Sequence, residues 1–203
     1  MPSIYDLKPR FQNLLRPLLR GLVAWKITPN MVTVLALMGS ILIGLLVGAH
    51  PGSSPWLLLL PVWLFMRMAL NAIDGMMARE FNLSSNLGAV LNELGDVLSD
   101  ICLYLPLAWI NERAGLGVIF FVVGAILTEF CGVLGKALGA TRHYEGPMGK
   151  SDRAFFVGLL ATLTFFFPVL LDHWFWIFVF GSLLTVLTCW NRIAGALKEL
   201  RGV

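Results

Sequence analysis

Apolar residues dominate six long stretches of the chain, and short polar or turn-forming segments separate them. The stretches cover residues 31–49, 56–73, 87–111, 115–139, 154–171 and 173–194. At a rise of about 1.5 Å per residue, each is long enough to cross the roughly 30 Å hydrocarbon core of a bilayer as an α-helix. Turn-forming and charged residues fill the breaks between them. The pattern predicts six transmembrane helices, with the short break at 171–174 as its weakest boundary.

The first 25 residues follow another pattern, in which apolar and basic side chains recur at helical spacing. The apolar set is Ile4, Leu7, Phe11, Leu14, Leu15, Leu18 and Leu19, and the basic set is Lys8, Arg10, Arg16 and Arg20. A basic amphipathic helix of this kind lies along a membrane surface. We therefore expect a juxtamembrane helix over 1–25 and a transmembrane domain over 26–203. A soluble helix packed on a partner is the alternative.

The composition excludes an ordinary soluble domain. Of 203 residues, 58% are hydrophobic and 13% are charged, and the mean hydropathy is +0.79. Soluble domains are roughly 45–50% apolar and about 25% charged. The expected fold class is an all-α integral membrane protein, and nothing in the composition indicates a nucleic-acid partner. The three cysteines and three histidines are scattered, which favours buried small side chains over disulfides and gives no metal cluster.

The positive charges predict the orientation in the membrane. With six alternating spans, Arg113 alone falls on one side, and Arg67 lies inside the second span toward the basic end. Positive charge is enriched in the cytoplasmic segments of membrane proteins. Both termini and the segment 71–100 are therefore expected on the cytoplasmic side. The basic side holds Lys8, Arg10, Arg16, Arg20, Lys26, Arg79, Lys136, Arg142, Lys150, Arg153, Arg192, Lys198 and Arg201.

Segment 71–100 places polar residues between two apolar stretches, where ionisable groups cost several kcal/mol unless they are paired or hydrated. At 100° per residue, Gly88, Asn92 and Asp96 form one stripe of the third predicted helix, with Asp100 one turn further on. Oxygen ligands at this spacing suit a hard divalent cation. On the second helix a matching face carries Arg67, Asn71 and Asp74.

A structural network of hydrogen bonds, with the carboxylates neutralised by Arg67 and Arg79, is the alternative interpretation of segment 71–100. Glu129, alone in the fourth stretch, has two open interpretations. One is a packed structural carboxyl paired with Arg67, and the other is a site residue.

The spacing of these residues resembles a family signature. Asp74-Gly75, Ala78-Arg79, eight residues, Gly88, and positions 92 and 96 fit D-x2-D-G-x2-A-R-x8-G-x3-D-x3-D, the pattern of the CDP-alcohol phosphotransferases. ITPNMVTVL at 27–35 resembles the Pro-Asn-x-x-Thr opening of that family. RMALNAIDGMMARE, LNELGDVLSD, TEFCG and GPMGKSDRA are similar to one bacterial branch of it.

The resemblance implies a reaction at the cytoplasmic face of a bacterial inner membrane. A hydroxyl of an acceptor alcohol attacks the β-phosphorus of a CDP-alcohol lipid, usually CDP-diacylglycerol, and CMP leaves. One or two Mg²⁺ or Mn²⁺ ions and a homodimer are also implied. Carried onto this chain, the base is Asp96 and the metal ligands are Asn71, Asp74, Asn92, Asp96 and Asp100. The nucleotide contacts are Asn30, Thr33, Asp74, Gly75, Ala78, Arg79, Ser84 and Gly88.

Two departures from the signature change the charge of the site. Asn71 and Asn92 stand where the family has its first and third aspartates, and an amide oxygen binds a cation without adding charge. Three explanations remain open: only one metal binds tightly, Glu93 or Asp100 supplies the missing charge, or catalysis is lost while ligand binding is kept. The second is favoured for Asp100, which lies one turn from Asp96.

Basic residues before the fifth stretch form the candidate acceptor site. They are Lys136, Arg142, Lys150 and Arg153, and Asp152 is placed to orient Arg153. Arginine offers a bidentate fork for the phosphate of an acceptor such as glycerol 3-phosphate. The general enrichment of cytoplasmic loops in basic residues is the alternative.

Two pairs of glycines are spaced four residues apart in the sequence. Gly44 with Gly48, and Gly135 with Gly139, indicate close helix packing, with a dimer face as a further option. The expected function is transfer of a phosphatidyl group to a small polar acceptor, either phosphorylated or unphosphorylated. A catalytically weakened CDP-lipid-binding scaffold and an ion-coupled transporter using Asp74, Asp96 and Glu129 are the rivals.

Overall fold

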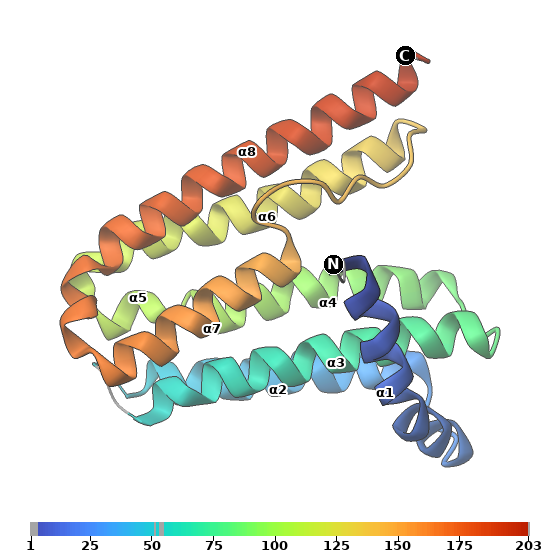
Figure 1. Ribbon diagram of the computed structural model, residues 1–203, viewed down its shortest axis with the longest axis horizontal. Coiled ribbons are helices and arrows are strands. Elements are labelled where there is room, and N and C mark those ends of the chain that lie inside the picture. The colour runs from blue at the N-terminus through green and yellow to red at the C-terminus, as the bar shows by residue number, and fades with distance from the viewer. Residues whose placement is uncertain (1–3, 51, 53–54, 203) are drawn as a thin grey trace.

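The computed structural model describes residues 4–50, 52 and 55–202, and no β-strand occurs among them. In Figure 1 the long helices run side by side along the longest axis, and the N-terminal helix crosses one end of the bundle. The elements are α1 (Ile4–Ala24), α2 (Pro29–Gly48), η1 (Pro55–Leu58), α3 (Leu59–Glu80), α4 (Asn86–Tyr104), α5 (Leu107–Ile110), η2 (Glu112–Ala114), α6 (Gly115–Ala137), α7 (Lys150–Phe166), η3 (Pro168–His173) and α8 (Trp174–Leu200).

Each of the six apolar stretches overlaps one long helix, but several boundaries differ from those predicted. α7 runs from Lys150 to Phe166 instead of over 154–171, and α8 continues to Leu200. α3 continues to Glu80, and its last two residues, Arg79 and Glu80, are exposed. The third stretch is divided: α4 ends at Tyr104, and α5 follows as a separate turn. Pro106 has no N–H to bond the Cys102 carbonyl, so an unbroken helix through 111 is not possible without the loss of a hydrogen bond.

Four of these helical segments are long and apolar enough to cross a membrane: Pro29–Gly48, Pro55–Glu80, Glu112–Ala137 and Pro168–Leu200. α4 contains three acidic residues, and α7 has only 17 residues. Large apolar side chains such as Leu42, Phe120 and Phe180 are exposed along the bundle. A surface of this kind is expected where helices face lipid. The six-span arrangement itself stays a prediction.

α1 packs against the protein with the side that carries Leu19. This side chain is 1% exposed and joins a cluster with Val32 of α2 and with Ile73, Met76 and Met77 of α3. Leu14 and Leu18 lie on another side of the same helix and are exposed. α1 therefore rests on the end of α3 that carries the polar segment, close to the candidate site.

The small residues of α2 and α6 allow close contact within the bundle. A Cβ added at Gly44 would clash with the Cys102 carbonyl of α4, and one added at Gly48 would lie 2.9 Å from Pro106. A Cβ at Gly135 would lie 2.9 Å from Ala196 of α8. Gly44, Gly48 and Gly135 therefore confirm close helix packing within one chain, whereas Gly139 lies in the turn beyond the end of α6 with φ +99°.

Candidate functional site

A pocket of about 650 Å³ lies where the polar ends of α2, α3 and α4 meet the loop before α7. Thr28 caps α2 by accepting from the backbone N–H of Met31, and Ser85 caps α4 by accepting from that of Gly88. Ser84 donates to the Ala78 carbonyl at 2.9 Å and closes the turn between α3 and α4. Local capping therefore fixes the helix ends that form one wall of the pocket.

All eight residues predicted to contact the nucleotide line this pocket. They are Asn30, Thr33, Asp74, Gly75, Ala78, Arg79, Ser84 and Gly88. A Cβ added at Gly88 would lie 2.8 Å from Asn30 Oδ1 and 3.1 Å from Ser85 Oγ. Thr33 Oγ1 donates to Asp74 Oδ2 at 2.8 Å and so ties α2 to α3. The structure brings these residues together, and their contact with a nucleotide stays a prediction.

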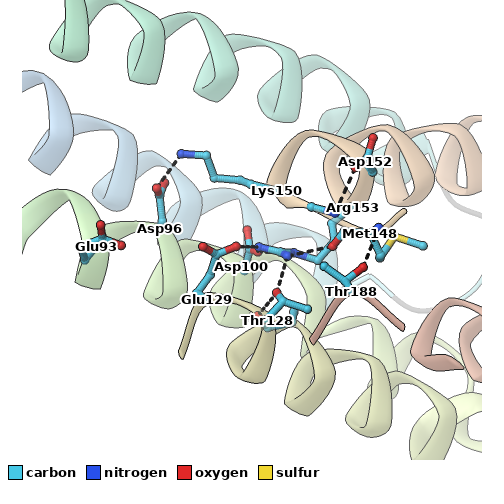
Figure 2. A network of polar contacts seen from close by, with 12 residues as sticks. Glu93, Asp96, Asp100, Thr128, Glu129, Met148, Lys150, Asp152, Arg153 and Thr188 are labelled. Carbon is cyan, nitrogen blue, oxygen red and sulfur yellow. Dashed lines mark hydrogen bonds and ion pairs between the residues drawn. The ribbon is translucent and has the colours of Figure 1, made fainter. Parts of the chain in front are cut away.

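Asp96 lines the pocket from α4, and protein groups contact both of its carboxylate oxygens. Asn71 Nδ2 donates to Oδ1 at 3.0 Å, and Arg67 lies 3.5 Å from the same oxygen. Lys150 Nζ, from the first residue of α7, lies 2.5 Å from Oδ2. Figure 2 shows the lysine side chain reaching across to the carboxylate. The side chains of α3, α4 and α7 therefore converge on Asp96.

Asp100 is buried beneath this group and is not among the residues that line the pocket. Arg67 lies 2.6 Å from its Oδ1, and Arg153 Nε donates to its Oδ2 at 2.9 Å. Two guanidinium groups thus neutralise this carboxylate. The geometry does not favour the prediction that Asp100 supplies the missing charge of a metal site, because Asp100 does not line the pocket and two guanidinium groups already balance its charge.

Glu129 of α6 lies at the centre of three arginines, and it also lines the pocket. Its carboxylate is 2.8 Å from Arg153, 2.9 Å from Arg142 and 3.5 Å from Arg192. The predicted pairing of Glu129 with Arg67 is wrong, because Arg67 is engaged by Asp96 and Asp100. Figure 2 shows the Arg153 end of this network, where the guanidinium also reaches Thr128 and the Met148 carbonyl.

The four predicted acceptor residues divide into two groups. Arg142 and Lys150 line the pocket, whereas Lys136 is an exposed residue in the last turn of α6 and Arg153 is fully buried behind the pocket wall. Asp152 accepts from the Gly149 backbone N–H at 3.0 Å and so fixes the start of α7. The prediction that Asp152 orients Arg153 is therefore not what the structure shows.

Arg192 and Tyr144 line the pocket but were not predicted from the sequence. Arg192 is 2% exposed and donates to the Thr128 carbonyl at 2.5 Å. The Arg142 guanidinium lies 5.0 Å from the centre of the Tyr144 ring, at cation–π distance. A charged residue two turns inside the end of an apolar helix was the available signal for Arg192.

The groups that face the pocket fit a divalent cation of the hard, oxygen-binding kind. Asn71, Asp74, Asn92 and Asp96 all line it, which provides two carboxylates and two amides. Across the described ranges, no three acidic, histidine or cysteine side chains converge on a single metal position.

Comparison with known proteins agrees with the resemblance of the signature. A family model described as CDP-alcohol phosphatidyltransferase matches residues 26–190. Inner membrane protein YnbA of Escherichia coli strain K12 is 45% identical over 192 residues, which is 94% of this chain and 93% of YnbA. An uncharacterised protein of Aquifex aeolicus strain VF5 is 34% identical over 94 residues, which is 46% of this chain and 45% of that protein.

Solved structures show the same fold. The phosphatidylinositol phosphate synthase of Mycobacterium tuberculosis, in complex with manganese and citrate, has a TM-score of 0.75 at 22% identity, covering 89% of this chain and 88% of that one. The same enzyme with CDP-DAG bound has a TM-score of 0.75 at 22% identity, covering 89% and 92%. The branch resemblance is confirmed by YnbA, and the signature by the family model. This chain belongs to the CDP-alcohol phosphatidyltransferase family.

Proposed function

We propose that this chain transfers a phosphatidyl group from CDP-diacylglycerol to a hydroxyl of a small polar acceptor and releases CMP. The observation that carries the proposal is one pocket lined by the signature residues, by Asp96 and by the basic side chains of Arg142 and Lys150. Such a pocket has room for a nucleotide diphosphate beside a polar acceptor. Family membership supports the reaction class, and the donor and acceptor belong to the proposal.

The donor nucleotide lies against the ends of α2, α3 and α4. Because Gly88 carries no side chain, the start of α4 approaches Asn30 closely and leaves the pocket open at that point. Arg79 reaches back over Gly75, whose added Cβ would lie 3.4 Å from the Arg79 guanidinium. The guanidinium is thereby placed beside the glycine turn, where it can pair with a phosphate.

The transfer step forms one P–O bond and breaks another. The acceptor oxygen attacks the β-phosphorus, CMP leaves with the electrons of the broken bond, and the hydroxyl proton passes to the Asp96 carboxylate. A divalent ion, held by Asp74 and Asp96 with the amides of Asn71 and Asn92, would neutralise charge on the pyrophosphate. Thr33 holds Asp74 toward the pocket through its hydrogen bond.

The acceptor lies toward Arg142 and Arg192. The Nε atoms of both side chains are buried and have no hydrogen-bond partner among the described residues. A buried donor without a partner is costly, so a ligand oxygen at this position is favoured. This supports an acceptor that carries an anionic group such as a phosphate. Arg153, whose guanidinium is already bonded on every side, has a structural role in this proposal.

The placement in the membrane follows from the distribution of charge. We place all six long helices across a bacterial inner membrane, with both termini and the pocket on the cytoplasmic side and α1 along that surface. The apolar exterior of the bundle and the basic residues around the pocket support this arrangement. A homodimer within the membrane belongs to the same proposal.

The decisive experiment is CMP release by the purified protein from CDP-diacylglycerol, with Mg²⁺ or Mn²⁺ and a panel of phosphorylated and unphosphorylated alcohols. Asp96→Asn should abolish release, whereas the matched control Asp172→Asn, in η3 at the opposite end of the bundle, should retain it. Release that depends on acceptor and on Asp96 supports the proposal. Release that is unchanged in Asp96→Asn would contradict the assigned base.

A CDP-lipid-binding scaffold is the second candidate, and the amides at positions 71 and 92 favour it. It predicts saturable binding of CDP-diacylglycerol by the wild-type protein without CMP release for any acceptor. Binding and release measured on the same preparation separate the two functions.

A further inference from the structure

We infer that the Lys150 ammonium takes the place of a second divalent ion beside Asp96, so that this chain binds a single divalent ion. The inference rests on the proposed function only for the location of the site. Its evidence is the set of groups that contact Asp96, of which Figure 2 shows Lys150.

Only two of the carboxylates that line the pocket are available to a metal. Five acidic residues line the pocket: Asp74, Glu93, Asp96, Glu129 and Asp152. Arg142 pairs with both Glu93 and Glu129, and Asp152 caps α7. Asp74 and Asp96 remain, with a combined charge of −2. The Lys150 ammonium balances one of these charges, so one divalent ion brings the sum for the two carboxylates, the lysine and the metal to +1, and a second would bring it to +3.

Asp96 has a protein partner on each of its carboxylate oxygens. Lys150 lies 2.5 Å from Oδ2, a short distance typical of a charge-assisted hydrogen bond. On the other oxygen, Asn71 donates from Nδ2 at 3.0 Å. An aspartate at position 71 would instead place two carboxylates in contact and would need a cation between them. Asn71 and Lys150 are therefore a matched pair: the amide removes a repulsion, and the ammonium supplies positive charge.

The position of Lys150 in the fold makes this arrangement durable. It is the first residue of α7, and the bond from Gly149 N–H to Asp152 fixes where that helix begins. Arg153, one turn later, anchors the same helix to Asp100 and Glu129. The backbone at Lys150 is therefore fixed, and the lysine side chain reaches Asp96 without a rearrangement of the preceding loop. Lys150 acts as a positioning residue that sets the charge and the metal count of the site.

The test is the stoichiometry of Mn²⁺ bound to the full-length purified protein, measured by electron paramagnetic resonance of free and bound ion. Wild type should bind one ion. Asn71→Asp/Asn92→Asp should bind one tightly and a second at least about tenfold more weakly, because the second must displace the ammonium. Adding Lys150→Gln to that pair should give two comparable sites with Mn–Mn spin coupling. Lys136→Gln, an exposed lysine outside the pocket, should change neither count nor affinity.

Two bound ions in wild type, no bound ion, or a triple variant that behaves like the double variant would each overturn the inference. CMP release is followed on the same samples, so the two proposals fail independently. A single ion without CMP release contradicts the proposed catalysis and leaves the role of Lys150 intact. CMP release by a protein that binds two ions supports the proposed catalysis and contradicts the role of Lys150.

Discussion

Arg153 Nη2 and Glu129 Oε1 lie 2.8 Å apart in a part of the bundle where the arginine side chain is 0% exposed. The same guanidinium lies 2.9 Å from Asp100. One buried arginine of α7 therefore joins α4 and α6, and it faces two carboxylates whose other partners are arginines as well. Removal of one partner from such a network leaves buried charge uncompensated, which is more costly than the pair itself is stabilising.

Arg153→Met is therefore expected to lower the free energy of unfolding by about 3–5 kcal/mol. The measurement is denaturant or thermal unfolding of the purified protein in detergent. Arg16→Met is the matched control, because Arg16 and Glu80 form an ion pair at 3.2 Å with side chains 45% and 36% exposed. An exposed pair contributes less than about 1 kcal/mol. Equal losses in the two variants would show that Arg153 has no special structural role.

Gly88→Ala tests the close approach between α4 and α2. The new methyl group would lie 2.8 Å from Asn30 Oδ1 and must displace that side chain into the pocket. Overpacking of this kind costs about 1–3 kcal/mol, so the affinity for CDP-diacylglycerol should fall roughly tenfold or more. Titration of the protein in nanodiscs with CDP-diacylglycerol measures this affinity.

The control for this variant is Gly21→Ala in α1, where an added Cβ has no neighbour within 4 Å. Its affinity should equal that of wild type. If Gly88→Ala binds the lipid as tightly as Gly21→Ala does, the Asn30 side of the pocket does not hold the nucleotide.

The long helices could be predicted because apolar length alone defines segments such as α2 and α6. The eight nucleotide candidates came from the resemblance of segment 71–100 and of ITPNMVTVL to the family signature, not from local geometry. They meet because the start of α2 packs against α3 and α4: Thr33 Oγ1 donates to Asp74 Oδ2 at 2.8 Å, and Asn30 lies beside Gly88.

The rest depended on contacts between distant parts of the chain. Glu129 has partners in the loop before α7, in α7 and in α8, and no periodicity specifies which arginine a lone acid will meet. Arg192 was indistinguishable from the basic residues that simply mark a cytoplasmic helix end. The spacing of Asp100 predicted a metal ligand, but Arg67 and Arg153 contact its two carboxylate oxygens inside the bundle, and the sequence does not indicate these contacts.

The proposed orientation predicts which engineered cysteines react from outside the cell. Arg113→Cys, in the exposed turn between α5 and α6, should react with a membrane-impermeant maleimide in intact cells. Lys198→Cys, exposed near the end of α8, should react only after the membrane is permeabilised. Both are made in a background without Cys102, Cys131 and Cys189. The opposite pattern would place the pocket on the outer face.

His143 predicts a pH dependence of stability in the loop between α6 and α7. Its Nδ1 lies 3.0 Å from Glu145 and its Nε2 lies 3.0 Å from Glu199. The hydrogen bond with Glu145 is the largest of the effects that raise the pKa of His143, and the hydrogen bond with Glu199 adds to it. A raised pKa in the folded state gives stability that is fully present below the unfolded imidazole pKa of about 6.5 and is lost as the pH rises through the folded value. The difference in melting temperature between wild type and His143→Gln should therefore be largest at low pH and should shrink above neutrality. Glu145→Gln should lower the pKa of His143, which NMR of the imidazole ring measures. A melting-temperature difference between wild type and His143→Gln that grows with pH would contradict the stabilising role of protonated His143.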